Sequence, residues 1–172
     1  TGTKLLITVD CGISNHKEIE LAQSLGMRSI VIDHHQVPSI APPADIVVDP
    51  AQDGCGFQEY RLSAAGLVWM LLIALKKKAE TLCGQADMLI PDPKDFLDLA
   101  AIGTICDMVP LNKVNRVIAA RGLEAVHKTS RPGLIALKEN AGIRSYRPIT
   151  GSSVAFALGP RINAAGRLHD AA

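Results

Sequence analysis

The chain has 172 residues, a formal net charge of +1 at pH 7, 48% hydrophobic residues and 20% charged residues. This length fits one domain, or one domain with part of another, and the composition excludes a disordered chain. No apolar run reaches the ~18 residues of a membrane span and no signal peptide is visible. The four cysteines follow no zinc-ribbon or redox spacing, so we expect free thiols in a cytoplasmic protein.

Charge is distributed unevenly along the chain. Residues 1–111 contain 8 basic and 14 acidic side chains, a balance of −6, whereas residues 112–172 contain 10 basic and 3 acidic side chains, a balance of +7. An acidic half can hold cations, and a basic half can face an anionic partner. Two ordinary surfaces with uneven charge would give the same numbers, so charge alone does not decide between these interpretations.

Short aliphatic runs separated by a helical pattern occupy the first part of the chain. Leu5–Val9, Arg28–Ile32 and Ile46–Val48 predict buried strands. Residues 15–25 predict a helix between the first two strands, because Asn15 and Glu18 have the spacing of a capping box and apolar residues form one face. A strand, a helix and a second strand make a βαβ unit, which contains a parallel pair of strands.

Everything after Asp49 is predicted to be helix or loop. The expected helical segments run from Ser63 to about Leu82, from Asp92 to Cys106, over 113–128, from Pro132 to near Gly142, and from Thr150 to Leu158. Gly159-Pro160 is expected to interrupt the last of these helices. The predicted fold class is therefore α/β, with a small parallel sheet flanked by helices and a helical second half.

All three predicted strands end in an aspartate, namely Asp10, Asp33 and Asp49. Ligands bind at the carboxyl edge of open parallel sheets, and carboxylates gathered there repel one another unless a cation neutralises them. His34 and His35 follow Asp33 directly, and two neighbouring residues at a strand end cannot both face the core. We therefore expect a metal or phosphate site at this edge, and we interpret Asp49, which precedes Pro50, as a turn former.

Asp107 is a fourth candidate for this site. It ends an apolar helical segment, where a carboxylate is unfavourable against the negative end of the helix dipole. A nearby cation would remove that penalty. Carboxylate and imidazole ligands together suit Mn, Zn or Fe, whereas carboxylates with water ligands suit Mg or Mn.

Several motifs occur in a familiar order. VDCG, IDHH and IGTICDMVPL, at these separations, resemble the DHH phosphoesterase superfamily. LGPRINAAGRL at residues 158–168 and the YRLSAAGLVW segment narrow the resemblance to the RecJ exonucleases, although that family often has Gly where Ala64 stands. The resemblance implies a hydrolase that degrades single-stranded DNA from 5′ to 3′ by a two-metal mechanism with Mn²⁺ or Mg²⁺, in DNA repair and recombination. It also implies a monomer that works with single-strand-binding protein and a helicase.

The resemblance also implies roles for individual residues. Asp10 would bridge both ions, and His34 and Asp107 would be further metal ligands. His35 would approach the scissile phosphate as a catalytic group. Asp33 would support the histidines, since a carboxylate on an imidazole nitrogen fixes tautomer and orientation.

Nucleic-acid contacts are expected near the end of the chain. From spacing alone, Arg161 and Arg167 could be two solvated arginines, but the resemblance favours phosphate contacts by Arg161, Asn163 and Arg167. The basic loop at residues 144–148 is a weaker candidate. Its Tyr146 could stack on a base or simply be packed.

The resemblance covers nearly the whole chain and implies its domain organisation. Residues 1–150 would form a partial DHH domain, and residues 151–172 would begin the segment that connects to a C-terminal domain. The chain begins after an earlier aspartate motif of the family, so we expect an internal fragment that binds Mn²⁺ weakly and degrades DNA very poorly.

Two alternatives remain open. An oligoribonuclease or cyclic-dinucleotide phosphodiesterase of the DHH superfamily would keep Asp10, His34 and Asp107 but needs no path for a long strand. A non-catalytic replication scaffold of the same fold would tend to lose these ligands. Comparing the hydrolysis of a long single strand with that of a dinucleotide tests the first alternative. Metal titration tests the second.

Overall fold

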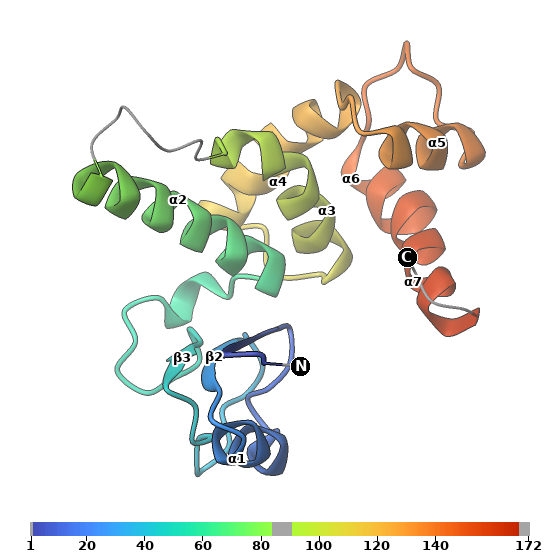
Figure 1. Cartoon of the computed structure of the whole chain (residues 1–172). Coiled ribbons are helices and arrows are strands. Elements are labelled where there is room, and N and C mark those ends of the chain that lie inside the picture. Colours follow the sequence, from blue (N-terminus) through green and yellow to red (C-terminus); the bar gives the residue numbers. More distant parts are fainter. Residues whose placement is uncertain (1, 84–90, 169–172) are drawn as a thin grey trace.

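The computed structural model of the chain describes residues 2–83 and 91–168. A parallel sheet in the order β1-β2-β3 forms one part of the molecule, and helices form the other (Figure 1). The strands are β1 (Leu5–Val9), β2 (Arg28–Ile32) and β3 (Ile46–Val48). All three have the predicted bounds, because each is a short aliphatic run bordered by polar or turn residues.

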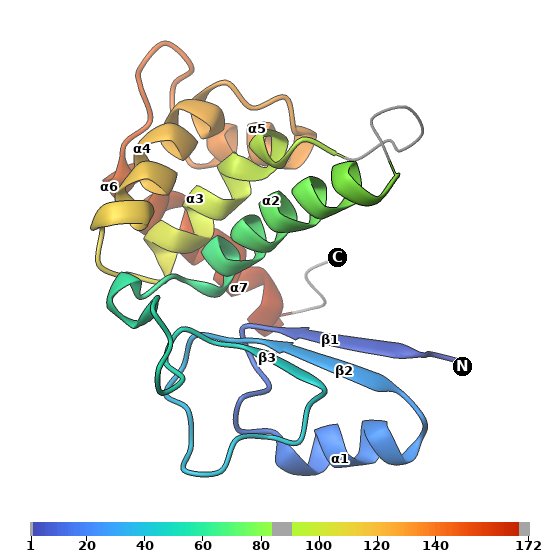
Figure 2. The same ribbon diagram turned by 90° about the vertical axis from the view of Figure 1, so that its left-hand side faces the viewer.

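The sheet carries helices on both faces, as Figure 2 shows. Helix α1 (His16–Ser24) packs on one face and buries Ile19 and Ala22. The helical part lies over the other face, where Ile32 of β2 joins Leu62, Leu67 and residues of α3 in a shared core. The sheet and the helical part are therefore connected by apolar packing as well as by the chain.

The helical part contains the remaining elements. In chain order these are η1 (Gln58–Tyr60), α2 (Ala64–Cys83), η2 (Pro93–Phe96), α3 (Leu97–Cys106), α4 (Lys113–His127), α5 (Pro132–Asn140), α6 (Gly151–Ser153), η3 (Val154–Leu158) and α7 (Gly159–Leu168). No strand follows β3 in the described residues, as predicted. Within the same residues, no helix has the length and apolar character needed to cross a bilayer.

Two glycines allow the central helices to approach closely. A Cβ atom at Gly122 of α4 would lie 2.1 Å from Cβ of Ala101 in α3, and one at Gly103 of α3 would lie 2.4 Å from Cβ of Ala65 in α2. Real side chains do not approach so closely, so α3 must meet both neighbours through glycine. This packing fixes the position of the end of α3, where Asp107 follows.

Two local predictions were wrong. The Asn15 side chain does not cap α1; its amide instead donates to Glu18 at 3.3 Å. Gly159-Pro160 does not interrupt the helical run, because η3 is a π-helical stretch that leads directly into α7. The Gly159 N–H donates to the Val154 carbonyl, five residues back, so the hydrogen-bond register changes directly before Pro160, which has no N–H to donate.

Candidate metal centre

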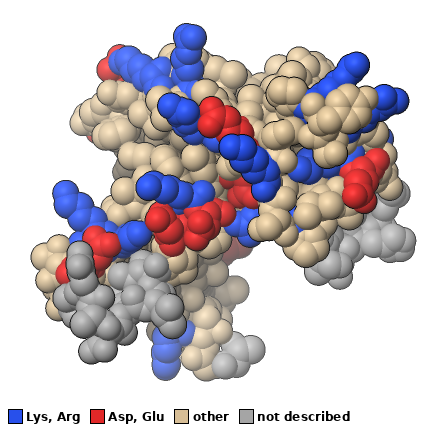
Figure 3. Space-filling view, turned by 90° about the horizontal axis from the view of Figure 1, so that it is seen from above, with Lys and Arg blue, Asp and Glu red and all other residues tan. Residues whose placement is uncertain are grey.

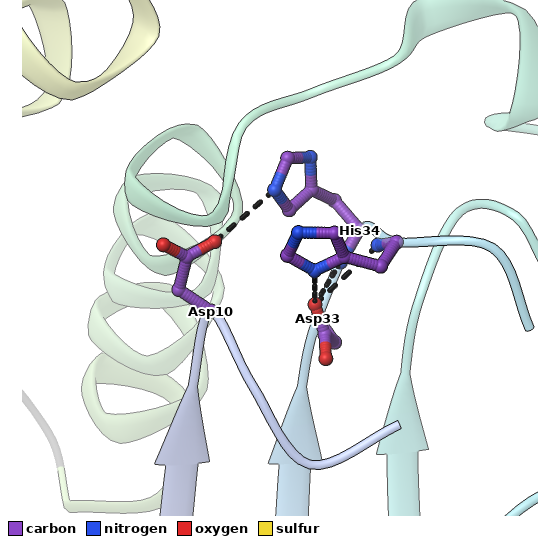
Figure 4. A group of neighbouring side chains, drawn as sticks. Asp10, Asp33 and His34 are labelled. Carbon is purple, nitrogen blue, oxygen red and sulfur yellow. Dashed lines mark hydrogen bonds and ion pairs between the residues drawn. The ribbon is translucent and has the colours of Figure 1, made fainter. Parts of the chain in front are cut away.

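The ends of β1 and β2 bring their polar residues together. Val9 is paired with Ile32, and the backbone N–H of Asp10 donates to the Ile32 carbonyl at 3.0 Å. Asp10 adopts a left-handed conformation with φ 63°, which is uncommon for a residue other than glycine. Figure 4 shows the result: the Asp10 carboxylate turns toward the His34 ring at the carboxyl edge of the sheet.

Asp10, His34 and Asp107 converge on one point. Nε2 of His34 lies 3.1 Å from Oδ1 of Asp10 and 3.5 Å from Oδ2 of Asp107. Neighbouring ligands of an octahedral ion bound at about 2.1 Å lie about 3 Å apart, so the separations of His34 from the two carboxylates suit ligands of one ion. The structure thus brings the three predicted ligands together, although they are far apart in the sequence.

Asp33 has a different environment. Its side chain is 1% exposed, and it accepts hydrogen bonds from the backbone N–H groups of Ile13 at 3.1 Å, His34 at 2.8 Å and His35 at 3.4 Å. Its Oδ1 atom also lies 2.6 Å from Nδ1 of His35. Burial raises the pKa of Asp33, but the hydrogen bonds from the His35 ring and these backbone groups outweigh it, and the pKa lies below its ordinary value.

The Asp33 bond orients the second histidine. The His35 side chain is 59% exposed, so its other ring nitrogen, Nε2, remains available to a ligand. The hydrogen bond from Asp33 raises the pKa of His35 against the opposing effect of burial, and the charges of Asp33, Asp10 and Asp107 raise it further. The buried Asp33 carboxylate therefore orients the His35 ring and favours its protonated form.

The donor set fits a divalent cation. One ligand atom from each of Asp10, Asp33, His34 and His35 lies within 4.8 Å of the others. Asp33 and His35 are hydrogen-bonded to each other. The residues suited to hold an ion are therefore Asp10, His34 and the neighbouring Asp107. Burial raises the pKa of Asp107 and the Asp10 charge adds to this, with His34 acting in the opposite direction. A bound cation would relieve that repulsion.

Asp49 is not part of this convergence. It is buried, and its Oδ1 atom accepts from the backbone N–H of Ala51 at 2.8 Å, which confirms its role in the turn. Burial raises the pKa of Asp49, opposed by that hydrogen bond. The third strand end therefore closes a turn and contributes no ligand atom to the cluster.

A pocket of 290 Å³ adjoins the centre. Asp10 and Asp107 line it together with Ser63 at the start of α2 and Ile162 and Asn163 on α7. The predicted nucleic-acid contact Asn163 thus shares a pocket with two predicted metal ligands. Arg161 is exposed and donates to the Ala157 carbonyl at 2.8 Å. The side chain of Arg167 lies outside the described residues.

A second pocket, of 520 Å³, is also lined by His34 and Asp107. Its other polar residues are Gln36, Gln58 and Arg61, and none of them was predicted from the sequence. The available signal was the position of Arg61 in the YRLSAAGLVW motif, but that motif alone did not indicate where its arginine lies.

The chain is similar to known proteins over nearly its whole length. Relatives include the single-stranded-DNA-specific exonuclease RecJ of Haemophilus influenzae, which is 40% identical over 97% of this chain and 29% of that protein. The exonuclease of the same name from Escherichia coli is 38% identical over 98% of this chain and 30% of that protein. The chain therefore spans less than a third of the length of these curated relatives.

Solved structures show the same fold. A crystal structure of exonuclease RecJ bound to manganese superposes with a TM-score of 0.81 at 38% identity, over 98% of this chain and 40% of that chain. RecJ from Thermus thermophilus in complex with Mn²⁺ gives 0.80 at 37% identity, over 98% of this chain and 24% of that chain.

The family match covers the sheet, its acidic edge and most of α3. Residues 3–104, more than half of the chain, match the DHH family, N-terminal domain. The chain belongs to the DHH family.

Proposed function

We propose that this chain is part of a metal-dependent single-stranded-DNA exonuclease that hydrolyses phosphodiester bonds from 5′ to 3′. The observation that carries the proposal is the convergence of Asp10, His34 and Asp107 beside a histidine that a buried carboxylate holds. The 40% identity to a RecJ exonuclease supports the choice of substrate. Because the chain spans less than a third of such relatives, the activity is proposed for the protein as a whole.

Asp10, His34 and Asp107 would hold Mn²⁺ or Mg²⁺. When bound, such ions lower the pKa of a bound water and stabilise the leaving oxygen of a phosphodiester. His34 would contribute Nε2, the ring nitrogen that lies near a carboxylate oxygen of both Asp10 and Asp107. The resemblance implies that Asp10 would be the ligand shared by both ions.

His35 would act on the phosphate itself. Its Nδ1 proton is held by Asp33, which directs Nε2 away from that carboxylate. The raised pKa of His35, due first to the Asp33 hydrogen bond, favours the charged form of the ring. A charged Nε2–H can donate to a phosphate oxygen as negative charge develops there.

The DNA path would follow the positive charge of the helical part. Residues 112–149 contain eight basic side chains and two acidic ones. Figure 3 shows the face that is uppermost in Figure 1, over which Lys and Arg side chains are spread. We propose that Arg161, Asn163 and Arg167 contact phosphates of the strand; Asn163 shares a pocket with the metal ligands Asp10 and Asp107. Such backbone binding is independent of sequence and weakens with salt.

Further parts of the proposal rest on the resemblance. They are a role in DNA repair and recombination, a cytoplasmic location, a monomeric state, and contacts with single-strand-binding protein and a helicase. The free thiols Cys11, Cys55 and Cys106 agree with a reducing compartment. We propose that the DHH domain ends at about residue 150. Val154 and Leu158, in the segment that follows, are buried in the helical core.

DNA hydrolysis tests the proposal. Single-stranded DNA labelled at either end is incubated with Mn²⁺ and the longer protein that contains this chain, and with its Asp10→Asn and Asp53→Asn variants. We expect mononucleotide release from the 5′ end, lost in Asp10→Asn and retained in Asp53→Asn, whose aspartate is exposed and lines neither pocket of the centre. Hydrolysis of a dinucleotide without hydrolysis of a long strand would favour the oligoribonuclease alternative and contradict the proposal.

A further inference from the structure

We infer that the pocket formed by Gln36, Gln58 and Arg61 beside His34 and Asp107, here called the Arg61 pocket, binds a nucleotide that adjoins the scissile phosphate. Arg61 would contact the phosphate of that nucleotide. This inference rests on the proposed function, because it assigns a further subsite to the same centre.

The position of the Arg61 pocket supports a substrate role. It shares Asp107 with the pocket that contains Asn163, and His34 also lines it. A strand whose scissile phosphate lies at the metal ligands therefore has a pocket for the nucleotide on each flank. The volume of 520 Å³ lies within the range of about 300–1,000 Å³ that is typical of small-molecule sites.

The polar groups of the Arg61 pocket suit a nucleotide. Within the described residues, the guanidinium of Arg61 has no carboxylate partner, and the Gln36 amide makes no hydrogen bond. Gln58 donates to the Gln52 carbonyl at 2.6 Å, which leaves its side-chain oxygen free to accept. A guanidinium binds phosphate through paired hydrogen bonds, and amides can pair with the edges of bases.

The walls of this pocket are held by a buried side chain. Asn115 of α4 is 0% exposed, and its amide donates to the carbonyls of Tyr60, Arg61 and Pro110, each at 3.0 Å. One side chain thus ties the segment before α2 to the segment after α3. Both segments contribute to the pocket, so its shape exists before any ligand arrives.

Backbone strain is concentrated at the same place. Arg61 has φ 42° and Met108 has φ 56°, and both line the pocket. Left-handed conformations of residues other than glycine are unfavourable and persist where the surrounding structure enforces them, often at ligand sites. A solvated arginine in an ordinary loop would have no need of this conformation or of the Asn115 contacts. The strain and the fixed walls together favour a preformed binding site.

Titration with thymidine 5′-monophosphate tests the inference. Amide and side-chain ¹H–¹⁵N NMR spectra of the 172-residue chain are followed in Mg²⁺ buffer, with thymidine and inorganic phosphate as separate probes. We expect the nucleotide to shift the Arg61 Nε–H and the Gln36 and Gln58 side-chain signals. Thymidine, which has no phosphate, should bind much more weakly.

Two substitutions locate the phosphate contact. Arg61→Met keeps a long side chain at the left-handed position and should weaken binding of the nucleotide by about tenfold or more, because it removes a charged hydrogen-bonding group. Lys17→Met, which removes an exposed basic side chain of α1 that lines neither pocket, should leave binding unchanged. If Arg61→Met does not fold, two results still test the pocket: the affinity of Gln36→Met for the nucleotide, and the residues whose signals shift in the wild type.

The outcomes separate this inference from the proposed function. Shifts confined to residues near Asn163, or no binding at all, would overturn the Arg61 pocket even if Mn²⁺ binds and DNA is hydrolysed. Conversely, shifts in the pocket that depend on Arg61 would support it even if the metal-dependent hydrolysis failed.

Discussion

Nδ1 of the exposed His35 lies 2.6 Å from Oδ1 of Asp33, which is buried and also accepts three backbone hydrogen bonds. Four protein donors thus surround this carboxylate, three at Oδ1 and one at Oδ2. Asp33 is not readily available as a metal ligand. It orients the His35 ring, whereas Asp10 and Asp107 face the His34 ring. This division of roles within three consecutive residues is the basis of the predictions that concern the centre.

Replacing Asp33 should destabilise the fold and loosen His35. Asp33→Asn places an amide donor among groups that all donate, so we expect a loss of about 1–3 kcal/mol in the free energy of unfolding. Urea denaturation measures this loss. Asp53→Asn should change it by less than about 0.5 kcal/mol. An unchanged stability in Asp33→Asn would contradict the role of the carboxylate as an acceptor for four donors.

The Asp33–His35 pair should make the stability of the metal-free chain depend on pH. The lowered pKa of Asp33 contributes stability above its ordinary value of 3.8, which is lost as pH falls through the folded-state value. The raised pKa of His35 contributes stability below its ordinary value of 6.5, which is lost as pH rises through the folded-state value. The contribution of the pair is therefore greatest between about pH 3.8 and 6.5.

The difference between wild type and His35→Gln isolates this contribution. Asp49 and Asp107 have raised pKa values, due first to burial, and destabilise the fold as they ionise, so the wild-type profile alone mixes opposite effects. We expect the stability difference between the two proteins to shrink above the folded-state pKa of His35. A difference that grows with pH instead would show that the ring is held in its neutral form.

Asp98 should be important for the helical core. It is buried on α3, and its carboxylate accepts from Leu99 N–H at 2.8 Å, from Thr129 at 3.0 Å and from Nε of Arg131 at 2.9 Å. Asp98→Ala should lower the free energy of unfolding by about 2 kcal/mol, because these donors lose their acceptor. Thermal or urea unfolding measures the effect, with the exposed Asp95→Ala as control. Equal losses in both variants would rule out a specific role for Asp98.

The close contact of α3 and α4 should not tolerate a methyl group. Gly122→Ala places a Cβ atom 2.1 Å from Cβ of Ala101 and 2.7 Å from the Leu97 carbonyl, so we expect a loss of about 1–3 kcal/mol. Gly133 in α5 is the matched control, since a Cβ atom there meets nothing within 4 Å. Gly133→Ala should be neutral or slightly stabilising, because alanine favours the helix. Comparable unfolding midpoints for both variants would contradict the packing.

The sheet and its polar edge could be predicted from the sequence for a clear physical reason. Aliphatic runs as short as Leu5–Val9 determine strands, and parallel pairing then brings Asp10 next to Asp33. The contacts that Asn115 makes with Tyr60 and Arg61, and those that Asp98 makes with Thr129 and Arg131, could not be predicted. In each case the partners lie more than 30 residues away in the sequence. The same holds for the left-handed Arg61, whose conformation depends on packing rather than on its own residue type.

Mn²⁺ binding to the chain tests the central claim most directly. Calorimetric titration compares wild type with Asp10→Asn, His34→Ala and Asp107→Asn, and with Asp53→Asn as control. Because we propose three ligands from this chain, we expect weak binding in wild type, a further loss of about tenfold or more in each ligand variant, and no change in the control. Mn²⁺ affinity that is the same in all five proteins would contradict a metal centre formed by Asp10, His34 and Asp107.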